Sequence, residues 1–252
     1  MISTLSTDKI LQTVVGIVTR HVSAGAPIEL LDIGSGTGAL IAALRTAHPC
    51  IKTRACDYTA SLMTLPDQPV DVVDLSRDGL PYEDACFDVV TCTEVVEHLE
   101  NYRRVVRETY RVVKPGGLVV FTTPNVLNLQ SRIRYLCFGF WNLFGPLPIG
   151  RRENFSTAGH ITPVPYFYLA HALVEAGFDP PRFTIDKVQR SALPKLILLW
   201  PLIAIYSALA IHRERRKYRT IDAGNEGMVR EMNRLDMLLG RTLVVFAHRP
   251  AA

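Results

Sequence analysis

Apolar residues follow two different spacings in the first half of the chain, and the two spacings alternate. Residues 8–22 place apolar side chains three and four positions apart, which predicts a helix. Residues 28–34 form a short apolar run that ends in a carboxylate and a glycine, which predicts a buried strand. The alternation continues to residue 125, with expected strands at 51–57, 70–76, 86–92 and 117–125 and expected helices at 37–48, 59–63 and 101–113. This order predicts an α/β fold whose mostly parallel sheet is covered by helices on both faces.

Polar residues mark several ends of these elements. Thr7 or Asp8 is the expected cap of the first helix, and Asn101 is the expected cap of helix 101–113. The sequence KPGG at 114–117 is expected to form the turn that ends this second helix. A strand then follows directly, as a βαβ unit requires.

The regular alternation ends after Asn125. Residues 160–178 predict a turn that leads into a helix, 182–188 predict a strand, and 228–239 predict a helix with one apolar face. The final segment, 241–249, is rich in β-branched residues and predicts another strand. A strand this close to the C-terminus has to pair with the sheet of the first half, because its backbone needs hydrogen-bond partners.

Length and composition favour one domain over two. The chain has 252 residues, of which 48% are hydrophobic and 21% charged; it is more apolar than an ordinary core requires, yet too charged for a polytopic membrane protein. The net charge of +4 does not by itself indicate a nucleic-acid partner. We therefore expect a single domain over 1–252, with halves at 26–125 and 126–252.

The cysteines and the N-terminus indicate the compartment. The five cysteines form no CxxC pair and lie in apolar surroundings, which is typical of reduced thiols in a cytoplasmic protein. The first residues lack the basic and long apolar regions of a signal peptide. No Cys/His cluster has metal-ligand spacing, so no metal is expected.

A glycine-rich turn follows the first predicted strand. Asp32, Gly34, Gly36 and Gly38 give the pattern D-x-G-x-G-x-G, which allows positive φ and a close approach of backbone to ligand. Alone, this pattern equally fits a tight strand-to-helix turn. Two more acids, Asp57 and Asp74, end the next two predicted strands, and Asp57 has the spacing of a ribose-binding carboxylate. Three such acids at one edge of a parallel sheet indicate a ligand site, although each alone could cap a turn.

These segments together resemble the class I S-adenosylmethionine-dependent methyltransferases. The resemblance rests on LLDIGSGTG, on CDY at Asp57, on VDLSRDGLPYEDACFDVVTCTEVVEHLEN and on RVVKPGGLVVFTTPN, in this order over residues 28–125. It implies a Rossmann-like, seven-stranded, mostly parallel sheet with an antiparallel last strand, which suits 241–249. Here the apolar inserts 132–152 and 193–219 follow the fifth and sixth strands.

The resemblance also implies S-adenosyl-L-methionine as the cofactor and assigns residues to it. Asp32, Gly34 and Gly36 would surround the methionine part, and Asp57 would hold the ribose hydroxyls. Asp74 and Leu75 would flank the adenine, and Thr93 and Glu94 would lie near the sulfonium. The full set of expected cofactor residues is Asp32, Gly34, Ser35, Gly36, Gly38, Asp57, Tyr58, Asp74, Leu75, Thr93 and Glu94.

Two histidines are candidates for the base that an acceptor hydroxyl would require. His98 follows the fourth strand, on the acceptor side in this family, and its ordinary pKa suits proton transfer. His160 lies in a region that lines the acceptor pocket of related small-molecule methyltransferases. The alternatives are structural: His98 with Glu97 could order the loop, and His160 could cap a turn. Glu94, Glu97 and His98 could contribute to a divalent metal site, as in some relatives, but no metal is assigned here.

The two apolar inserts indicate contact with a membrane. Residues 196–211 carry no charge and are followed by five cations around Glu214, which suits anionic headgroups. If 182–188 and 241–249 are neighbouring strands, the segment between them starts and ends on one side, so a single crossing is excluded. Pro201 is expected to break the run and to favour a bent or re-entrant helix in one leaflet. The second insert combines aromatics with flanking arginines. A buried core helix, a lid over an apolar substrate and a homodimer contact are the alternatives.

The sequence therefore predicts a methyltransferase, and O-methylation of a lipid-like or amphiphilic acceptor at the cytoplasmic face of a membrane is the leading hypothesis, with C- or N-methylation open. A quinone precursor or a lipid-linked sugar would fit such a site. The protein would be peripheral or monotopic on an anionic inner membrane face, with no nucleic-acid partner. A soluble small-molecule methyltransferase with a dimer interface is the first alternative. A non-catalytic membrane-associated interaction protein of the same fold is the second.

Overall fold

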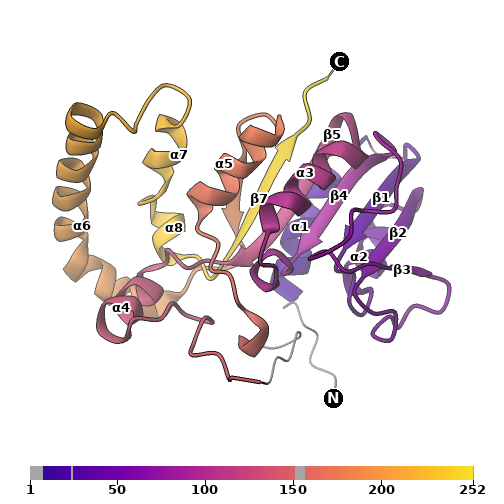
Figure 1. The fold of residues 1–252 in the computed structure, drawn as a ribbon, viewed down its shortest axis with the longest axis horizontal. Coiled ribbons are helices and arrows are strands. Elements are labelled where there is room, and N and C mark those ends of the chain that lie inside the picture. Colours follow the sequence, from indigo (N-terminus) through magenta and orange to yellow (C-terminus); the bar gives the residue numbers. More distant parts are fainter. Residues whose placement is uncertain (1–7, 24, 151–156, 252) are drawn as a thin grey trace.

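A computed structural model describes residues 8–23, 25–150 and 157–251. Its centre is a seven-stranded sheet with the order β3-β2-β1-β4-β5-β7-β6 (Figure 1). The strands are β1 (Ile28–Ile33), β2 (Ile51–Asp57), β3 (Val70–Val72), β4 (Phe87–Thr93), β5 (Val113–Pro124), β6 (Arg182–Ile185) and β7 (Thr242–His248). The helices are α1 (Asp8–His21), α2 (Ala39–Ala47), α3 (Tyr102–Val112), α4 (Leu129–Phe138), α5 (Tyr166–Ala176), α6 (Leu193–Arg213), α7 (Glu226–Glu231) and α8 (Leu235–Leu239). Short 3-10 turns η1 (Val96–His98), η2 (Thr157–Gly159) and η3 (Arg190–Ala192) and the π-helical turn η4 (Glu214–Tyr218) complete the chain.

The predicted fold class is confirmed. Strands β1 to β5 pair in parallel, while β7 lies antiparallel between β5 and β6. The side chain of Asn101 accepts a hydrogen bond from the Arg104 backbone N–H, as expected of a helix cap. The C-terminal strand thus finds its sheet, and its antiparallel direction matches the fold that the resemblance implied.

Four elements differ from the sequence prediction. Residues 59–63 form turns instead of a helix, because the Thr59 hydroxyl accepts a hydrogen bond from the Ser61 N–H and so competes with helical pairing. Strand β3 ends at Val72, since Asp74 turns the chain by accepting from the Ser76 N–H. The KPGG segment belongs to the irregular start of β5, where the register with β4 shifts. The predicted helix 228–239 is divided into α7 and α8.

The alternation of side chains along each strand builds two apolar layers, one on each face of the sheet. Along β1, Leu31 and Ile33 join the layer that includes α3 and α5, whereas Leu30 joins the layer under α1 and α2. Along β5, Phe121 and Val120 divide in the same way, and both are fully buried. Both faces of the sheet are therefore covered, as its continuous apolar strands require.

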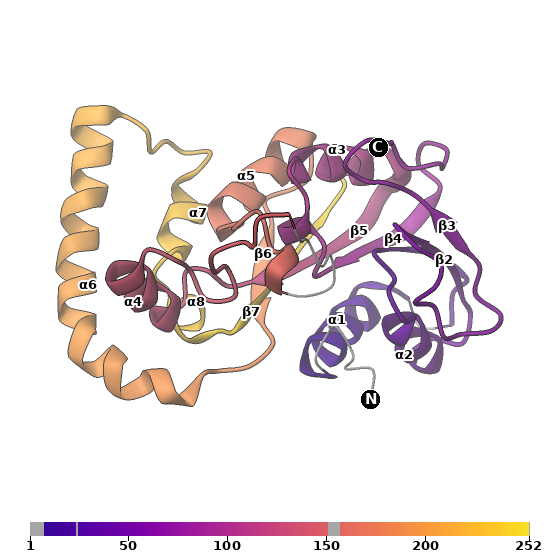
Figure 2. The same cartoon turned by 60° about the horizontal axis from the view of Figure 1, so that its bottom comes forward.

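A third apolar cluster joins the two inserts beyond the β6 edge of the sheet. Its buried members include Leu129 of α4, Leu196 of α6 and Leu238 of α8, and Ile133, Leu199 and Ile203 pack against them. Figure 2 shows α4, α6 and α8 together at one end of the molecule. The inserts thus form one structural unit, which stands beside the sheet rather than on its faces.

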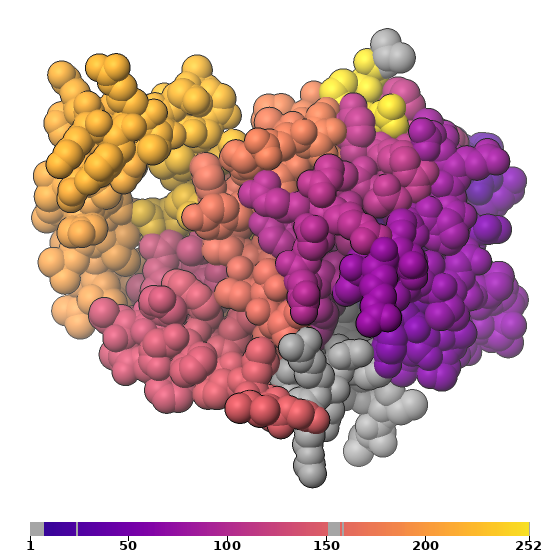
Figure 3. All heavy atoms as spheres, viewed as in Figure 1, coloured from indigo at the N-terminus to yellow at the C-terminus, as the bar shows by residue number. Residues whose placement is uncertain are grey.

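Helix α6 continues through Pro201 and is bent, as Figure 2 shows, which is the first of the two forms, bent or re-entrant, that were expected at this proline. The apolar stretch Arg190–Tyr218 is long enough to cross a membrane, and only 6% of its most apolar window is buried. A buried core helix, which was one alternative, does not describe α6. In the space-filling view an opening separates its far end from α7 (Figure 3).

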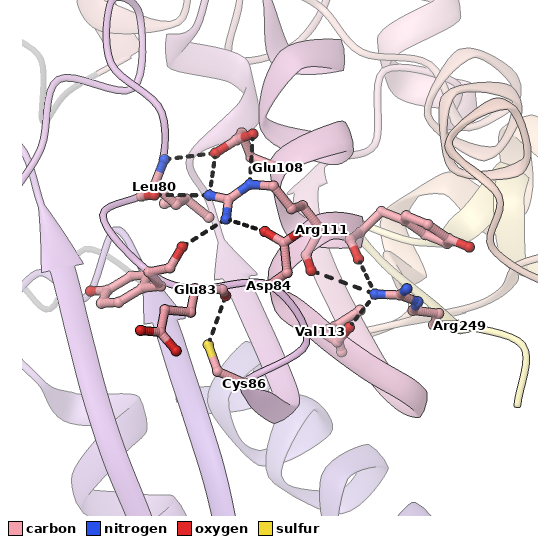
Figure 4. A network of polar contacts seen from close by, with 10 residues as sticks. Leu80, Glu83, Asp84, Cys86, Glu108, Arg111, Val113 and Arg249 are labelled. Carbon is pink, nitrogen blue, oxygen red and sulfur yellow. Dashed lines mark hydrogen bonds and ion pairs between the residues drawn. The ribbon is translucent and has the colours of Figure 1, made fainter. Parts of the chain in front are cut away.

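A polar network around Arg111, near the end of α3, connects this helix to the neighbouring segments (Figure 4). The Arg111 guanidinium donates two hydrogen bonds to the Glu108 carboxylate, at 3.2 and 2.8 Å, and others to Asp84 and to the carbonyls of Leu80 and Tyr82. The bond from Arg111 is the main reason why the pKa of Glu108 is lowered. Arg249 donates to the carbonyls of Tyr110 and Val113 and lies over the Tyr110 ring. The C-terminal segment is therefore anchored to the end of α3.

Replacement of Arg111 should reveal the weight of this network. Arg111→Ala leaves two carbonyls and two carboxylates without their donor, and we expect a loss of about 2–3 kcal/mol in the free energy of unfolding. Urea unfolding followed by circular dichroism measures this change. Arg107→Ala, on the exposed side of the same helix, is the matched control and should change stability by less than about 0.5 kcal/mol. Equal effects would show that the network adds nothing to stability.

Candidate functional site

A cavity of about 980 Å³ lies at the carboxyl ends of β1, β2 and β4. This is the edge at which open α/β sheets bind ligands. Twelve of the residues expected from the sequence line it: Asp32, Gly34, Ser35, Gly36, Asp57, Tyr58, Asp74, Leu75, Thr93, Glu94, His98 and His160. Gly38 does not; it caps the start of α2, where a side chain would collide with Met63 and Leu65.

The glycine turn adopts the backbone that its sequence pattern requires. Gly34, Gly36 and Gly38 have φ values of 72°, 50° and 80°, all in the left-handed region that favours glycine. The N–H groups of Gly34 and Ser35 both donate to the Cys56 carbonyl, at 2.8 and 3.2 Å, and so fasten the turn to the end of β2. The turn therefore holds a fixed shape at the wall of the cavity.

Two buried carboxylates lie beside this turn. Asp57 accepts hydrogen bonds from the N–H groups of Gly36, at 2.9 Å, and Thr59, at 3.3 Å. Asp32 is 2% exposed and accepts from the Thr91 hydroxyl at 2.7 Å. Burial raises the pKa of Asp32 to about 7, against the hydrogen bond from Thr91. Asp74, by contrast, is exposed, follows β3 by two residues and forms an ion pair with Arg77.

Buried hydroxyls without partners face the same region. The side-chain oxygens of Ser35 and Thr93 are inaccessible and make no hydrogen bond, although both residues line the cavity. A buried hydroxyl without a partner is costly, and a ligand with polar groups can satisfy it. The carboxylates and these hydroxyls together fit a nucleoside-type ligand that also carries an amino-acid part.

Glu94 is held in a strained position just beyond β4. Its φ of 56° lies in the left-handed region, and its N–H and side chain are both bound to Thr122. Non-glycine residues adopt this backbone rarely, and such strain concentrates at functional sites. Burial raises the pKa of Glu94 to about 7. Glu94 can therefore exchange a proton near neutral pH at the cavity wall.

His98 and His160 meet at the wall of the same cavity. Their ring centres lie 4.7 Å apart, in an edge-to-face arrangement. The Nδ1 atom of His98 lies 3.0 Å from the Gly159 carbonyl, and that of His160 lies 3.0 Å from the Leu143 carbonyl. These carbonyls require N–H at Nδ1, so each Nε2 keeps a lone pair. Burial lowers the pKa of both rings, that of His160 to about 4, so both are neutral at pH 7.

These histidines and Glu97 can also hold a divalent cation. Glu97 is fully buried, one of its oxygens accepts from Thr123 and the other has no partner. One ligand atom from each of Glu97, His98 and His160 lies within 4.8 Å of the others. Backbone carbonyls that fix a histidine through Nδ1 are common around metal sites. No metal was expected from the sequence, which does not reveal that His160 lies beside Glu97 and His98.

Among the lining residues that the sequence did not predict, three come from segments far from the glycine turn. Arg241 directly precedes β7, and its charge partly opposes the rise in the pKa of Glu94. Leu143 and Ile161 come from the segment between α4 and α5, whose backbone bonds to Glu97. These residues are far from the glycine turn in sequence, and only the fold brings them to the cavity. The position of Arg241 at the start of the last predicted strand, 241–249, was the one available signal.

Known proteins share both the sequence and the fold of this region. Residues 31–121 match the model of the family described as "Methyltransferase domain". A demethylmenaquinone methyltransferase of Deinococcus radiodurans is 32% identical over 104 residues, which cover 38% of this chain and 43% of the relative. A ubiquinone biosynthesis O-methyltransferase of Pseudomonas putida is 56% identical over 39 residues, 16% of this chain and 17% of the relative. The chain thus spans less than half the length of these curated relatives.

Solved structures extend the likeness in fold to almost the whole chain. A S-adenosylmethionine-dependent methyltransferase from Archaeoglobus fulgidus has a TM-score of 0.56 at 17% identity, with 94% of each chain covered. A phosphoethanolamine N-methyltransferase 2 from Haemonchus contortus, in complex with S-adenosyl-L-methionine, has a TM-score of 0.54 at 13% identity and covers 95% of this chain and 52% of its own. Residues 31–121 thus match the methyltransferase domain model, and almost the whole chain has the Rossmann-like fold of solved S-adenosylmethionine-dependent methyltransferases.

Proposed function

We propose that this protein is an S-adenosylmethionine-dependent methyltransferase that methylates an oxygen of a lipid-like or amphiphilic acceptor at the cytoplasmic face of a membrane. One observation carries the proposal. A single cavity joins the glycine turn and its carboxylates to a pair of neutral histidines with free Nε2 atoms. The first group suits the cofactor, and the second suits an acceptor that must lose a proton.

The cofactor half of the cavity divides among its polar groups. Asp57 holds the ribose hydroxyls, since its carboxylate closes the turn at the end of β2. Asp32 and the glycine turn surround the methionine part, where the unpartnered hydroxyls of Ser35 and Thr93 gain hydrogen bonds. Asp74 and Leu75 flank the adenine at the open end. When bound, the cofactor supplies an electrophilic methyl group on a positively charged sulfur.

The histidine half then prepares the acceptor. His98 accepts the hydroxyl proton at Nε2 while the acceptor oxygen takes the methyl group, so that the acceptor leaves as a methyl ether. His98 suits this role better than His160, whose lower pKa makes it the weaker base. Leu143 and Ile161 line the cavity with apolar side chains and hold the apolar part of the acceptor in place. Fixing the two reactants in line supplies much of the rate.

The apolar surface at the inserts supports an amphiphilic acceptor. Segment 139–150 contributes Leu143 to the cavity wall. Three apolar residues of this segment are exposed: Leu143, Leu147 and Ile149. Large exposed apolar patches mark interaction sites. The matched relatives are named for menaquinone and ubiquinone biosynthesis, which favours a quinone precursor over a lipid-linked sugar. We therefore propose a monotopic enzyme on an anionic membrane face.

Loss of the Asp57 carboxylate should abolish cofactor binding. Asp57→Ala removes the carboxylate that accepts hydrogen bonds from the ribose hydroxyls in the proposed complex and from the Gly36 N–H in the protein. We expect the affinity for S-adenosylmethionine to fall at least about 100-fold in calorimetry. Asp67→Ala, an exposed aspartate outside the cavity, is the control and should bind as the original chain does. Unchanged affinity for Asp57→Ala, with the fold intact by circular dichroism, would contradict the cofactor assignment.

The acceptor class follows from where the methyl group goes. With methyl-labelled S-adenosylmethionine and a bacterial extract, we expect the label to enter the organic phase after extraction with solvent. Label in that phase that is not released under mild base excludes a methyl ester. Label confined to the aqueous phase would favour the alternative of a soluble small-molecule methyltransferase. No transfer to any extract component would favour a non-catalytic protein.

The pH profile distinguishes His98 from Glu94 as the base. A base acts in its unprotonated form, so the rate falls as pH decreases through its pKa. For His98, whose pKa is lowered from 6.5, kcat/KM should stay constant from pH 8 down to about 6.5 and fall only below that. For Glu94, with a pKa of about 7, the fall would begin near pH 7.

His98→Ala should lower kcat by about 100-fold, with His171→Ala on α5 as the control outside the cavity. Full turnover by His98→Ala, together with a decline near pH 7, would transfer the role to Glu94.

A further inference from the structure

Helix α6 presents two different sides. Leu196, Leu199, Ile203 and Ser207, spaced three and four residues apart, face the protein: the first three pack in the third apolar cluster, and Ser207 accepts a hydrogen bond from Asn233. The outer stripe, which we define as Leu198, Leu202, Ile205 and Leu209, has the same spacing on the side away from the protein. These four side chains are 62–75% exposed. A continuous apolar stripe of about 16 Å therefore faces outward.

The topology prevents α6 from crossing a bilayer. Strands β6 and β7, which precede and follow the insert, are paired in one sheet, so both ends of the insert lie on one side. A crossing would need a second apolar helix for the return. The returning segment consists of α7 and α8, and it carries the charged or polar residues Glu226, Arg230, Glu231, Asn233, Arg234 and Asp236. These side chains exclude a two-helix span.

The positive charges also exclude an inserted tip. Helix α6 ends at the turn of the insert with Arg213, Arg215, Arg216, Lys217 and Arg219 around a single acid, Glu214. If the insert entered the bilayer tip first, these cations would go deepest, where charge is strongly disfavoured. Lys195 lies at the other end of the helix. Cations at both ends of an apolar stripe reach headgroups together only when the helix lies along the surface.

A second apolar surface adjoins α6. On α4, Leu136 is 84% exposed and Phe138 57%. Helix α4 is fixed to the start of α6, because Lys195 donates to Gln130 at 2.8 Å and both helices share the third apolar cluster. Both views of the ribbon place α4 beside α6 at the same end of the molecule (Figures 1 and 2). The segment after α4 then leads to Leu143, which lines the cavity.

We infer that α6 lies flat in the headgroup layer of an anionic bilayer, with its outer stripe and the exposed apolar residues of α4 resting together on the acyl chains. An amphiphilic acceptor then reaches the cavity past Leu143 while its tail stays among the lipids. This orientation rests on the proposed membrane function and refines it. It replaces the re-entrant dip that Pro201 suggested, because the helix continues through that residue. The five cations select anionic lipids.

Vesicle flotation tests the lipid partner. The protein should float with vesicles of phosphatidylglycerol and phosphatidylcholine and remain at the bottom with phosphatidylcholine alone. Arg216→Gln/Lys217→Gln should lower partitioning to the anionic vesicles by about 30-fold. The control, Arg20→Gln/Arg107→Gln, removes the same charge from α1 and α3 and should float as before. Equal losses in the two variants would show a general charge effect and would overturn the assigned surface.

Depth measurements test the orientation. The chain has two tryptophans, so Trp141→Phe/Trp200→Phe gives a background without them. A single tryptophan is then placed by Leu198→Trp, Ile205→Trp or Leu209→Trp, and its fluorescence is quenched by lipids brominated at different depths. A flat helix gives the same shallow depth at all three positions, and Leu136→Trp on α4 gives a similar one. Tyr168→Trp, exposed on α5, should not be quenched. A depth that changes steadily along α6 would overturn the flat orientation.

A second copy of the chain is the competing occupant of this surface. Sedimentation without lipid decides this point: we expect a monomer, and we expect Leu202→Glu to abolish flotation. A dimer that Leu202→Glu dissociates, with flotation unchanged, would assign the outer stripe to self-association. Cofactor binding and methyl transfer are measured separately. Normal transfer with a graded depth profile thus refutes the orientation alone, whereas absent transfer refutes the enzyme proposal.

Discussion

The close approach of the glycine turn to the segment after β4 is the constraint on which the site depends. A side chain at Gly34 would overlap the Cγ2 atom of Val95, so only glycine allows the end of β1 to lie against this segment. The same turn is fastened to β2 through the Cys56 carbonyl. Three neighbouring strands are thereby fixed at one edge, and the cavity lies where they end. Val95 in turn precedes η1, which carries Glu97 and His98, so the position of the acceptor groups follows from the same contact.

The two ends of the cavity differ in how their polar groups are satisfied. At the glycine turn, Asp57 is bound by backbone N–H groups that the strand ends supply, so its place follows from regular structure. Beyond β4, Glu94 lines the cavity with a strained backbone, while Glu97, which is not among the lining residues, keeps an unpartnered oxygen. Burial raises the pKa of both glutamates, that of Glu94 to about 7 and that of Glu97 well above its usual range. The first end is thus built for binding, whereas the second contains groups whose charge depends on what occupies the cavity.

The sequence predicted the parts of this arrangement that depend on local pattern. The predicted bounds of six elements differ from the observed ones by at most two residues, because their apolar spacing and buried faces agree. These elements are strands β1, β2, β4 and β7 and helices α1 and α3. The helix predicted at 59–63 is wrong, because the Thr59 hydroxyl competes for backbone hydrogen bonds. The local sequence could not decide whether the helix at Pro201 would be bent or re-entrant. Of the site, Gly38 was misplaced because a glycine can serve helix packing as well as ligand approach. Arg241 and the meeting of His98 with His160 depend on pairings across more than 60 residues, which a single sequence does not reveal.

The place of β7 has a consequence for how the chain is made. This strand is synthesised after the other six strands of the sheet, yet it lies between β5 and β6 and gives both of them their partner on that side. Until residues 242–248 are synthesised, β5 has an open edge and β6 has no partner in the sheet. The apolar helix α6 is already complete at that stage. A nascent chain therefore carries an open strand edge and an exposed apolar helix at once, and both favour aggregation. Early capture of α6 by a membrane surface would remove the second hazard while the sheet waits for its final strand.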